Sequence, residues 1–126
     1  MAATKERRRP AGRFEVRSKV WVEKDGKVAL SSWRIELLAT VEETGSLSAA
    51  CERMGVPYRT AWYKLKEIEE QLGVRLLDTV SGGTDGGGSV LTPEAREIVD
   101  RFRRVDRGIE GIVERRFESE LGDLIG

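Results

Sequence analysis

The chain has 126 residues, enough for one domain with a single core. Its 22 Lys and Arg balance 22 Asp and Glu, which excludes a uniformly basic nucleic-acid-binding surface. It has no His and a single Cys, Cys51, which excludes imidazole base chemistry, His-containing zinc sites and an internal disulfide. It has neither an apolar run of roughly 20 residues nor a signal-peptide core. We expect a cytoplasmic protein that is not an enzyme and has no cofactor, metal, membrane or small-molecule site.

Charge is distributed unevenly along the chain. Residues 1–34 hold ten basic and four acidic side chains, so this part carries +6 and the rest carries −6. The run Lys5–Arg9 concentrates the positive charge. We expect residues 1–13 to form a disordered basic arm, which either tracks phosphates or is a solvated terminus without function.

Alternating apolar residues near the N-terminus predict a β-hairpin. Phe14, Val16, Val20 and Val22 alternate with polar residues, and apolar residues resume after Asp25-Gly26. Asp-Gly accepts the positive φ of a type I′ turn, so the strands should flank it. A helix follows over about 33–44, capped by Ser31 or Ser32 and ended by Gly45.

The next segment predicts a helix–turn–helix over about 46–71. A short helix capped by Ser46 or Ser48 ends at Met54, and Gly55 tolerates the left-handed φ of a helix end. Pro57 suits the start of a new helix, expected over 58–71. Its apolar residues recur at steps of four, three and four, as Ala61, Leu65, Ile68 and Leu72. The small residues Ala49, Ala50 and Cys51 suit close helix packing, with Cys51 expected in the core and a redox-sensing thiol as its alternative.

A Gly-rich hairpin and a long helix complete the predicted fold. Strands are predicted at Val74–Leu77 and at Val90-Leu91, so we expect a wing over about 74–91. The loop between them is a wing tip that approaches DNA, a plain flexible loop or a nucleotide site; its glycines are Gly82, Gly83, Gly86, Gly87 and Gly88. Thr92-Pro93-Glu94 predicts the start of a helix over about 93–121.

The element order predicts a mainly α fold with small β content: a winged helix–turn–helix over 14–126, with an N-terminal β-hairpin and a long C-terminal helix. The long helix shows a coiled-coil seam with steps of four, three, four and three: Ile98, Phe102, Val105, Ile109 and Ile112. Trp21 and Trp33 are expected in the core, and Trp62 at the edge of the buried face.

The helix at 58–71 has a polar side that suits DNA. Between Pro57 and Lys66 there are three basic residues and no acid. In a helix–turn–helix the second helix lies in the major groove, where Arg bonds guanine and Thr or Tyr reaches phosphate or the thymine methyl. We expect base contacts from Arg59, Thr60 and Tyr63, and backbone or mixed contacts from Ser48, Tyr58, Trp62, Lys64 and Lys66. A merely solvated amphipathic helix is the alternative.

Several motifs resemble the N-terminal DNA-binding domain of ModE regulators, which respond to molybdate. They are Thr44–Val56, Tyr58–Trp62 (Tyr-Arg-Thr-Ala-Trp) and the Gly-rich segment Gly82–Gly88. Leu65–Asp78 is similar to the wider LysR-type winged helix, and the whole resemblance covers about 19–120. It implies a homodimer paired through the long helix and the N-terminal hairpin, with the seam residues as dimer interface.

The resemblance also implies a transcriptional regulator that binds double-stranded DNA. Full-length ModE members carry oxyanion-binding domains after the long helix, whereas this sequence ends at Gly126. We therefore expect a stand-alone, sequence-specific DNA-binding regulator without a ligand-binding domain. The alternative is a winged-helix protein-interaction module that acts through its long helix and binds no specific DNA; the zero net charge favours it.

Overall fold

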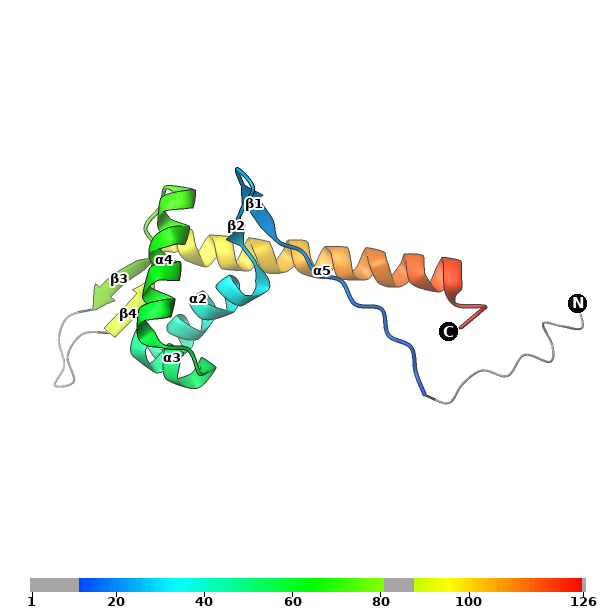
Figure 1. Cartoon of the computed structure of the whole chain (residues 1–126), viewed down its shortest axis with the longest axis horizontal. Coiled ribbons are helices and arrows are strands. Elements are labelled where there is room, and N and C mark those ends of the chain that lie inside the picture. Colours follow the sequence, from blue (N-terminus) through cyan, green and yellow to red (C-terminus); the bar gives the residue numbers. More distant parts are fainter. Residues whose placement is uncertain (1–11, 81–87, 126) are drawn as a thin grey trace, which may run out of the picture. The chain divides into compact units, whose positions relative to one another are not determined.

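The computed structural model describes residues 12–80 and 88–125. Along these residues the elements are β1 (Val22–Lys24), β2 (Lys27–Leu30), α2 (Ser32–Thr44), α3 (Leu47–Met54), α4 (Tyr58–Leu72), β3 (Leu77–Val80), β4 (Gly88–Leu91) and α5 (Pro93–Leu121) (Figure 1). The predicted order of hairpin, helices, wing and long helix is confirmed. The chain forms two units: residues 19–106 make the larger one, and residues up to 18 with those from 107 onward make the smaller.

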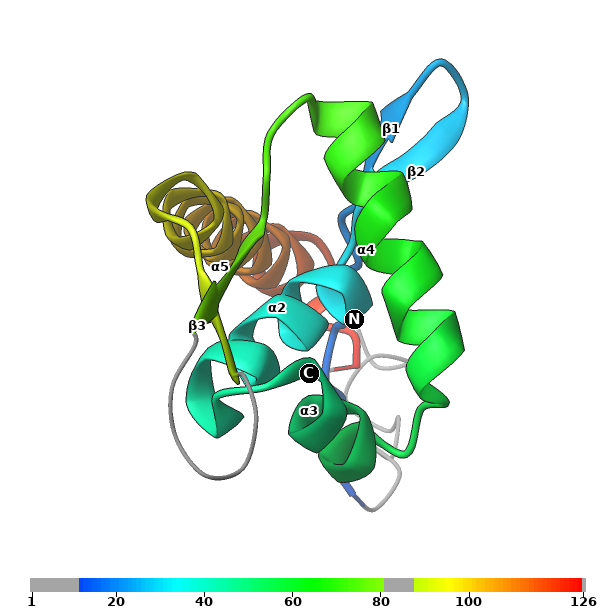
Figure 2. The same cartoon turned by 90° about the vertical axis from the view of Figure 1, so that its left-hand side faces the viewer.

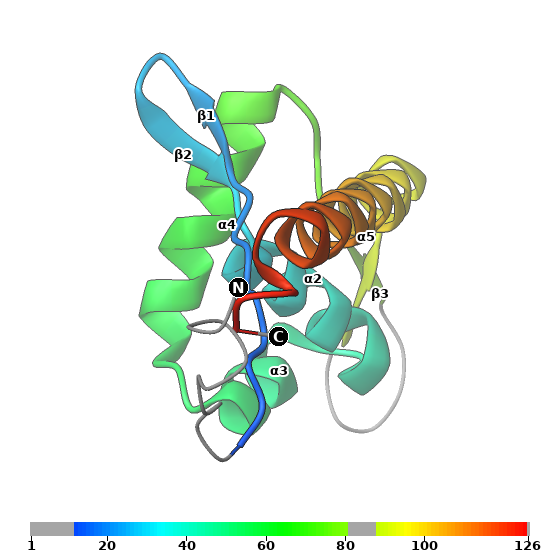
Figure 3. The same cartoon turned by 90° about the vertical axis from the view of Figure 1, so that its right-hand side faces the viewer.

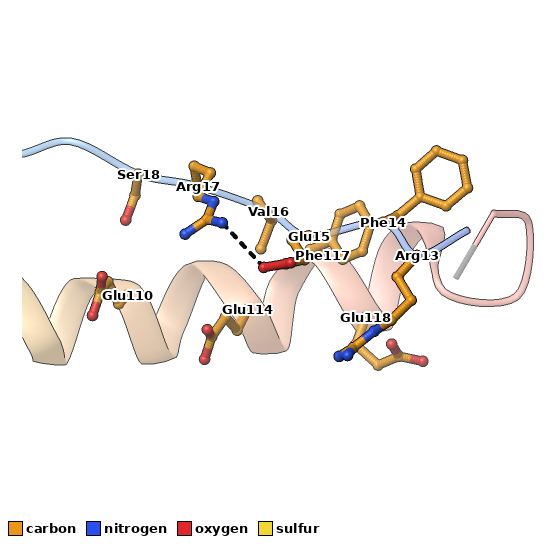
Figure 4. A pocket seen from close by; sticks show the side chains of 10 residues that line it. All are labelled: Arg13, Phe14, Glu15, Val16, Arg17, Ser18, Glu110, Glu114, Phe117 and Glu118. Atoms are coloured by element: carbon orange, nitrogen blue, oxygen red, sulfur yellow. Dashed lines mark hydrogen bonds and ion pairs between the residues drawn. The ribbon is translucent and has the colours of Figure 1, made fainter.

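The N-terminal hairpin is shorter than its sequence pattern predicts. β1 and β2 pair antiparallel around Asp25 and Gly26, whose φ values of 52° and 81° confirm the expected turn. Residues 14–21 belong to no strand, so this part of the prediction is wrong. Residues 13–18 run as an extended segment beside the end of α5 within the smaller unit (Figure 4). Val16 is half-buried there, whereas Phe14 is exposed.

Polar caps and glycines fix the ends of the central helices. Ser31 Oγ accepts from Arg34 N at 3.3 Å, and Ser46 Oγ accepts from Ala49 N at 3.0 Å, so Ser46 rather than Ser48 caps α3. Gly55 has φ +68° at the end of α3, where an added side chain would strain the backbone. Each helix therefore ends where its sequence signals predicted.

One hydrophobic core lies within the larger unit. Its largest fully buried side chains are Leu37, Leu38, Val41, Ile68 and Leu76. Cys51 is buried among them, as expected, and this burial raises the pKa of its thiol. A redox role for Cys51 therefore has no support, because a reactive thiol needs exposure and a lowered pKa.

The tryptophans outside α4 do not lie in the core, contrary to expectation. Trp33 stands in the first turn of α2 and is exposed. Trp21 is also exposed, and its indole N–H donates to Glu23 at 2.8 Å. The prediction that both tryptophans are buried rested on residue type alone, and neither residue lies on a buried face.

The wing hairpin begins later than predicted. Val74 and Leu76 precede β3, and Leu76 is fully buried in the core. β3 pairs antiparallel with β4, from Leu77 opposite Leu91 to Val80 opposite Gly88. The other wing glycines (Gly82, Gly83, Gly86 and Gly87) lie outside the described residues, as do residues 1–11 of the expected arm.

The helix α5 has the predicted bounds, but the five residues of its predicted coiled-coil seam differ in burial. Phe102 is only 7% exposed and belongs to the core, and Ile98 packs against that core. The chain's own core therefore covers Phe102 and part of Ile98, and the dimer-interface role of the five residues stays a prediction. Val105 and Ile112 are 53% and 49% exposed, and Ile109 is half-buried. Apolar spacing predicts a covered stripe, yet the covering surface can be the chain's own core as well as a second helix.

Candidate nucleic-acid interface

The helix α4 is buried on one side and open on the other. Ala61, Leu65 and Ile68 point into the core. The opposite side carries the exposed residues Arg59, Thr60, Tyr63, Lys66 and Glu67, as predicted. Figure 2 shows α4 to one side of α2 and the β3–β4 hairpin to the other. The exposed side of α4 thus faces away from the core that holds the helix.

Aromatic side chains gather on the first two turns of α4. Tyr58 and Tyr63 are 53% and 59% exposed, and Trp62 is also exposed. The Trp62 and Tyr63 rings meet edge to face, with centroids 5.2 Å apart. Together with Arg59, these three side chains line an open hollow of about 350 Å³. We call this set the aromatic hollow.

The cations of α4 differ in how they are paired. Within residues 12–80 and 88–125, no ion pair involves Arg59. Lys66 Nζ lies 5.4 Å from the centroid of the Trp62 ring and 3.4 Å from Glu69 Oε1. Lys64 Nζ lies 4.0 Å from Glu67. Of the three expected contact cations, only the Arg59 guanidinium is unneutralised in this part of the chain.

A buried arginine outside the helix–turn–helix positions α4. Arg34 of α2 donates from Nη2 to Glu67 Oε1 at 2.6 Å and from Nη1 to Gln71 Oε1 at 3.2 Å. It also lies 3.4 Å from Ala29 O of β2. Arg34 could not be recognised from the sequence, because no local pattern marks a pair whose partners lie 33 residues apart.

The N-terminal hairpin completes this support. Gln71 Nε2 donates to Val28 O at 2.9 Å, and Lys24 Nζ donates to Gln71 O at 2.8 Å. Figures 2 and 3 both show the hairpin beside the C-terminal end of α4. The hairpin therefore braces α4 and leaves its first two turns open.

The base of the wing is attached to the turn between α2 and α3. Ser89 N donates to Gly45 O at 2.7 Å. A Cβ added to Gly88 would lie 2.6 Å from Gly45 O, so only glycine fits this close approach. Ser48, the remaining expected contact residue, lies exposed on α3.

Glu42 connects three elements around the wing. Its carboxylate accepts from Arg96 Nε of α5 at 2.5 Å and from Leu91 N of β4 at 3.1 Å. The hydrogen bond from Arg96, followed by that from Leu91, lowers the pKa of Glu42. The same pair raises the pKa of Arg96. This carboxylate therefore stays ionised in the folded protein and fixes β4 against α2.

A second hollow lies within the smaller unit. The extended segment and α5 line it with Arg13, Arg17, Glu110, Glu114 and Glu118 (Figure 4). Among the described residues, no group of three or more His, Cys, Asp or Glu is arranged to hold a metal ion. None of the described helices has an apolar stretch long enough to cross a membrane.

Two known proteins with similar sequences are named for molybdenum. The molybdenum-pterin-binding protein MopB of Rhodobacter capsulatus is 31% identical over 121 residues, which cover 96% of this chain and 43% of MopB. The molybdenum transport protein ModE of Azotobacter vinelandii is 32% identical over 102 residues, 81% of this chain and 37% of ModE. The chain thus spans less than half the length of either relative, and the ModE-like resemblance is confirmed.

The fold is shared with LysR-family regulators. Vibrio fischeri DarR, solved in complex with DNA, superposes with a TM-score of 0.54 at 21% identity, over 77% of this chain and 31% of DarR. Residues 33–96 match the protein-family model described as "Bacterial regulatory helix-turn-helix protein, lysR family". Because this match covers half of the chain, the chain belongs to the lysR family of bacterial regulatory helix-turn-helix proteins.

Proposed function

We propose that this chain is a sequence-specific DNA-binding domain of a transcriptional regulator, with α4 as its recognition helix. The observation that carries the proposal is the exposed aromatic and cationic side of α4, which lies opposite its buried side. In a helix–turn–helix, the first turns of the second helix meet base edges in the major groove. The DNA complex of DarR supports this use of the fold.

Individual residues take different roles in this proposal. Arg59 is free of carboxylate partners in the described chain, so it can bond the O6 and N7 atoms of a guanine. Thr60 and Tyr63 lie exposed on the same helix and are proposed to read neighbouring bases. The remaining contacts, to the backbone or mixed, come from Ser48, Tyr58, Trp62, Lys64 and Lys66.

We further propose that two chains pair through α5 when they bind DNA. Val105 and Ile112 are exposed apolar residues on this helix, and water contact with them is unfavourable. A two-fold dimer would present two copies of α4 to two half-sites. Such half-sites should lie about 10 base pairs, or a multiple of that, apart.

Selection of bound sequences from a random duplex pool tests the DNA-binding proposal. The expected result is one preferred two-fold symmetric site, bound more tightly than a scrambled duplex at about 100 mM salt. Equal binding to both duplexes, or none at this salt, would contradict the proposal, because phosphate contacts alone give no preference.

A protein-interaction module is the second candidate function. The exposed Val105 and Ile112 favour it, since they would suit a partner helix of another protein as well as a second copy. Under this alternative, substitutions on α4 should leave partner binding intact, whereas Val105→Asp should abolish it. If the chain is instead a DNA-binding regulator, substitutions on α4 should abolish its preference for one DNA sequence.

A further inference from the structure

We propose that the aromatic hollow on α4 is a subsite for the 5-methyl group of a thymine, with Arg59 placed to bond a guanine in the next base pair. This inference rests on the proposed DNA-binding function and adds the base to be recognised. Its basis is the juxtaposition around one hollow of three exposed aromatic rings and a guanidinium that forms no ion pair with any residue the structure describes.

The hollow is formed before any ligand arrives. Its residues occupy positions i, i+1, i+4 and i+5 of α4, which lie on one face of a helix. The edge-to-face contact between Trp62 and Tyr63 fixes the two rings relative to each other. Lys66 over the Trp62 ring restrains that ring further. An apolar group entering the hollow therefore meets rings that are already ordered.

The charges around the hollow favour DNA over a protein segment as its occupant. Arg59 lines the hollow, Lys66 lies over the Trp62 ring, and Lys64 follows Tyr63 in the chain, while the acids of α4 begin at Glu67. The first two turns of α4 thus present cations to an approaching chain of phosphates. Glu67 is also occupied, because its carboxylate binds Arg34.

Within the major groove, the apolar group available to such a hollow belongs to thymine. Guanine, adenine and cytosine present hydrogen-bonding atoms at their edges, whereas thymine adds a C5-methyl group. The rings of Tyr58, Trp62 and Tyr63 can cover a methyl group, and the Arg59 guanidinium on the rim matches guanine O6 and N7. The geometry thus fits a thymine beside a guanine.

Replacing thymine by deoxyuridine tests the subsite, because this change removes the methyl group alone. Each thymine of the selected duplex is replaced in turn, and the dissociation constant is measured by fluorescence anisotropy. In each half-site, we expect that replacing a thymine beside a guanine by deoxyuridine weakens binding about three- to fivefold, which is the effect of one buried methyl group. Thymines elsewhere should give no change.

Protein variants then test whether the aromatic hollow causes the weaker binding of the deoxyuridine duplex. In Trp62→Ala and in Tyr63→Ala, the thymine and deoxyuridine duplexes should bind equally, because the rings that cover the methyl group are incomplete. Trp21→Ala is the matched control: Trp21 is an exposed tryptophan outside α4 and should keep the full discrimination. Circular dichroism checks that all three variants fold.

Three results would overturn the proposal. A preferred site in which no deoxyuridine weakens binding would refute the subsite while the DNA-binding function stands. Discrimination that persists in both Trp62→Ala and Tyr63→Ala would place the methyl contact elsewhere on the protein. Selection that yields no preferred duplex would refute the subsite together with the proposed function.

Discussion

The Arg34 guanidinium and the Glu67 carboxylate form a 2.6 Å ion pair that joins the start of α2 to α4. The Arg34 side chain is buried, whereas Glu67 is about half exposed. A buried cation is costly unless its hydrogen bonds are satisfied, and here Glu67, Gln71 and Ala29 O satisfy them. This pair therefore holds α4 at a defined angle while its first two turns stay open.

We expect Arg34→Met to lower the free energy of unfolding by about 1–3 kcal/mol, because it leaves Ala29 O without its donor and removes the tie to α4. Urea unfolding measures the change. Arg101→Met is the matched control, since Arg101 makes an exposed pair with Glu97 at 3.4 Å and should cost less than about 0.5 kcal/mol. Equal losses in both variants would show that the buried pair does not stabilise the fold.

Two glycine substitutions should change stability in opposite directions. Gly88→Ala should destabilise the protein by about 1–3 kcal/mol, because the new Cβ would meet Gly45 O and push the wing away from the α2–α3 turn. Gly108→Ala should stabilise it by about 0.5–1 kcal/mol, because Gly108 lies inside α5 with open space around it. Thermal unfolding compares the two. A Gly88→Ala protein as stable as the parent would contradict the close approach.

Substitutions at Phe102 and Val105 should distinguish the part of α5 that packs in the core from the part that we propose to self-associate. Phe102→Ala should cost about 3–5 kcal/mol of unfolding free energy, because it removes a buried core side chain. Val105→Asp should leave the fold intact and weaken self-association, which sedimentation equilibrium measures. An unchanged association constant for Val105→Asp would show that the exposed apolar residues of α5 do not form a dimer interface.

Acid should weaken the contact between Glu42 and the wing. Its pKa is lowered in the folded state, so this carboxylate stabilises the fold fully above its unfolded pKa, and that stabilisation is lost as the pH falls through the folded pKa. Glu42→Gln should therefore flatten the acid limb of stability against pH, measured by urea unfolding between pH 7 and pH 3. The same slope in parent and variant would exclude Glu42 as a contributor.

Local signals predicted most of the helices because glycines and caps mark their ends. Gly45, Gly55 and Gly73 all adopt positive φ where the sequence placed helix ends. The burial of Phe102 in the core could not be predicted, because periodicity gives an apolar stripe without the surface that covers it. Arg34 could not be found in this way, since its ion pair depends on how α2 and α4 pack. The open side of α4 was predictable from spacing, whereas the hollow depends on ring orientations.

The role of α4 as recognition helix is tested by the affinity ratio between the selected duplex and a scrambled duplex. This ratio is measured for the parent, Arg59→Ala and Lys66→Ala over a range of salt concentrations. Arg59→Ala should lose about 1–3 kcal/mol on the selected duplex and relax the preference at one base pair. Lys66→Ala should weaken both duplexes alike and reduce the salt slope by about one. If Arg59→Ala instead weakens both duplexes equally, or neither, α4 does not read DNA sequence through this residue, which contradicts its role as base-reading recognition helix.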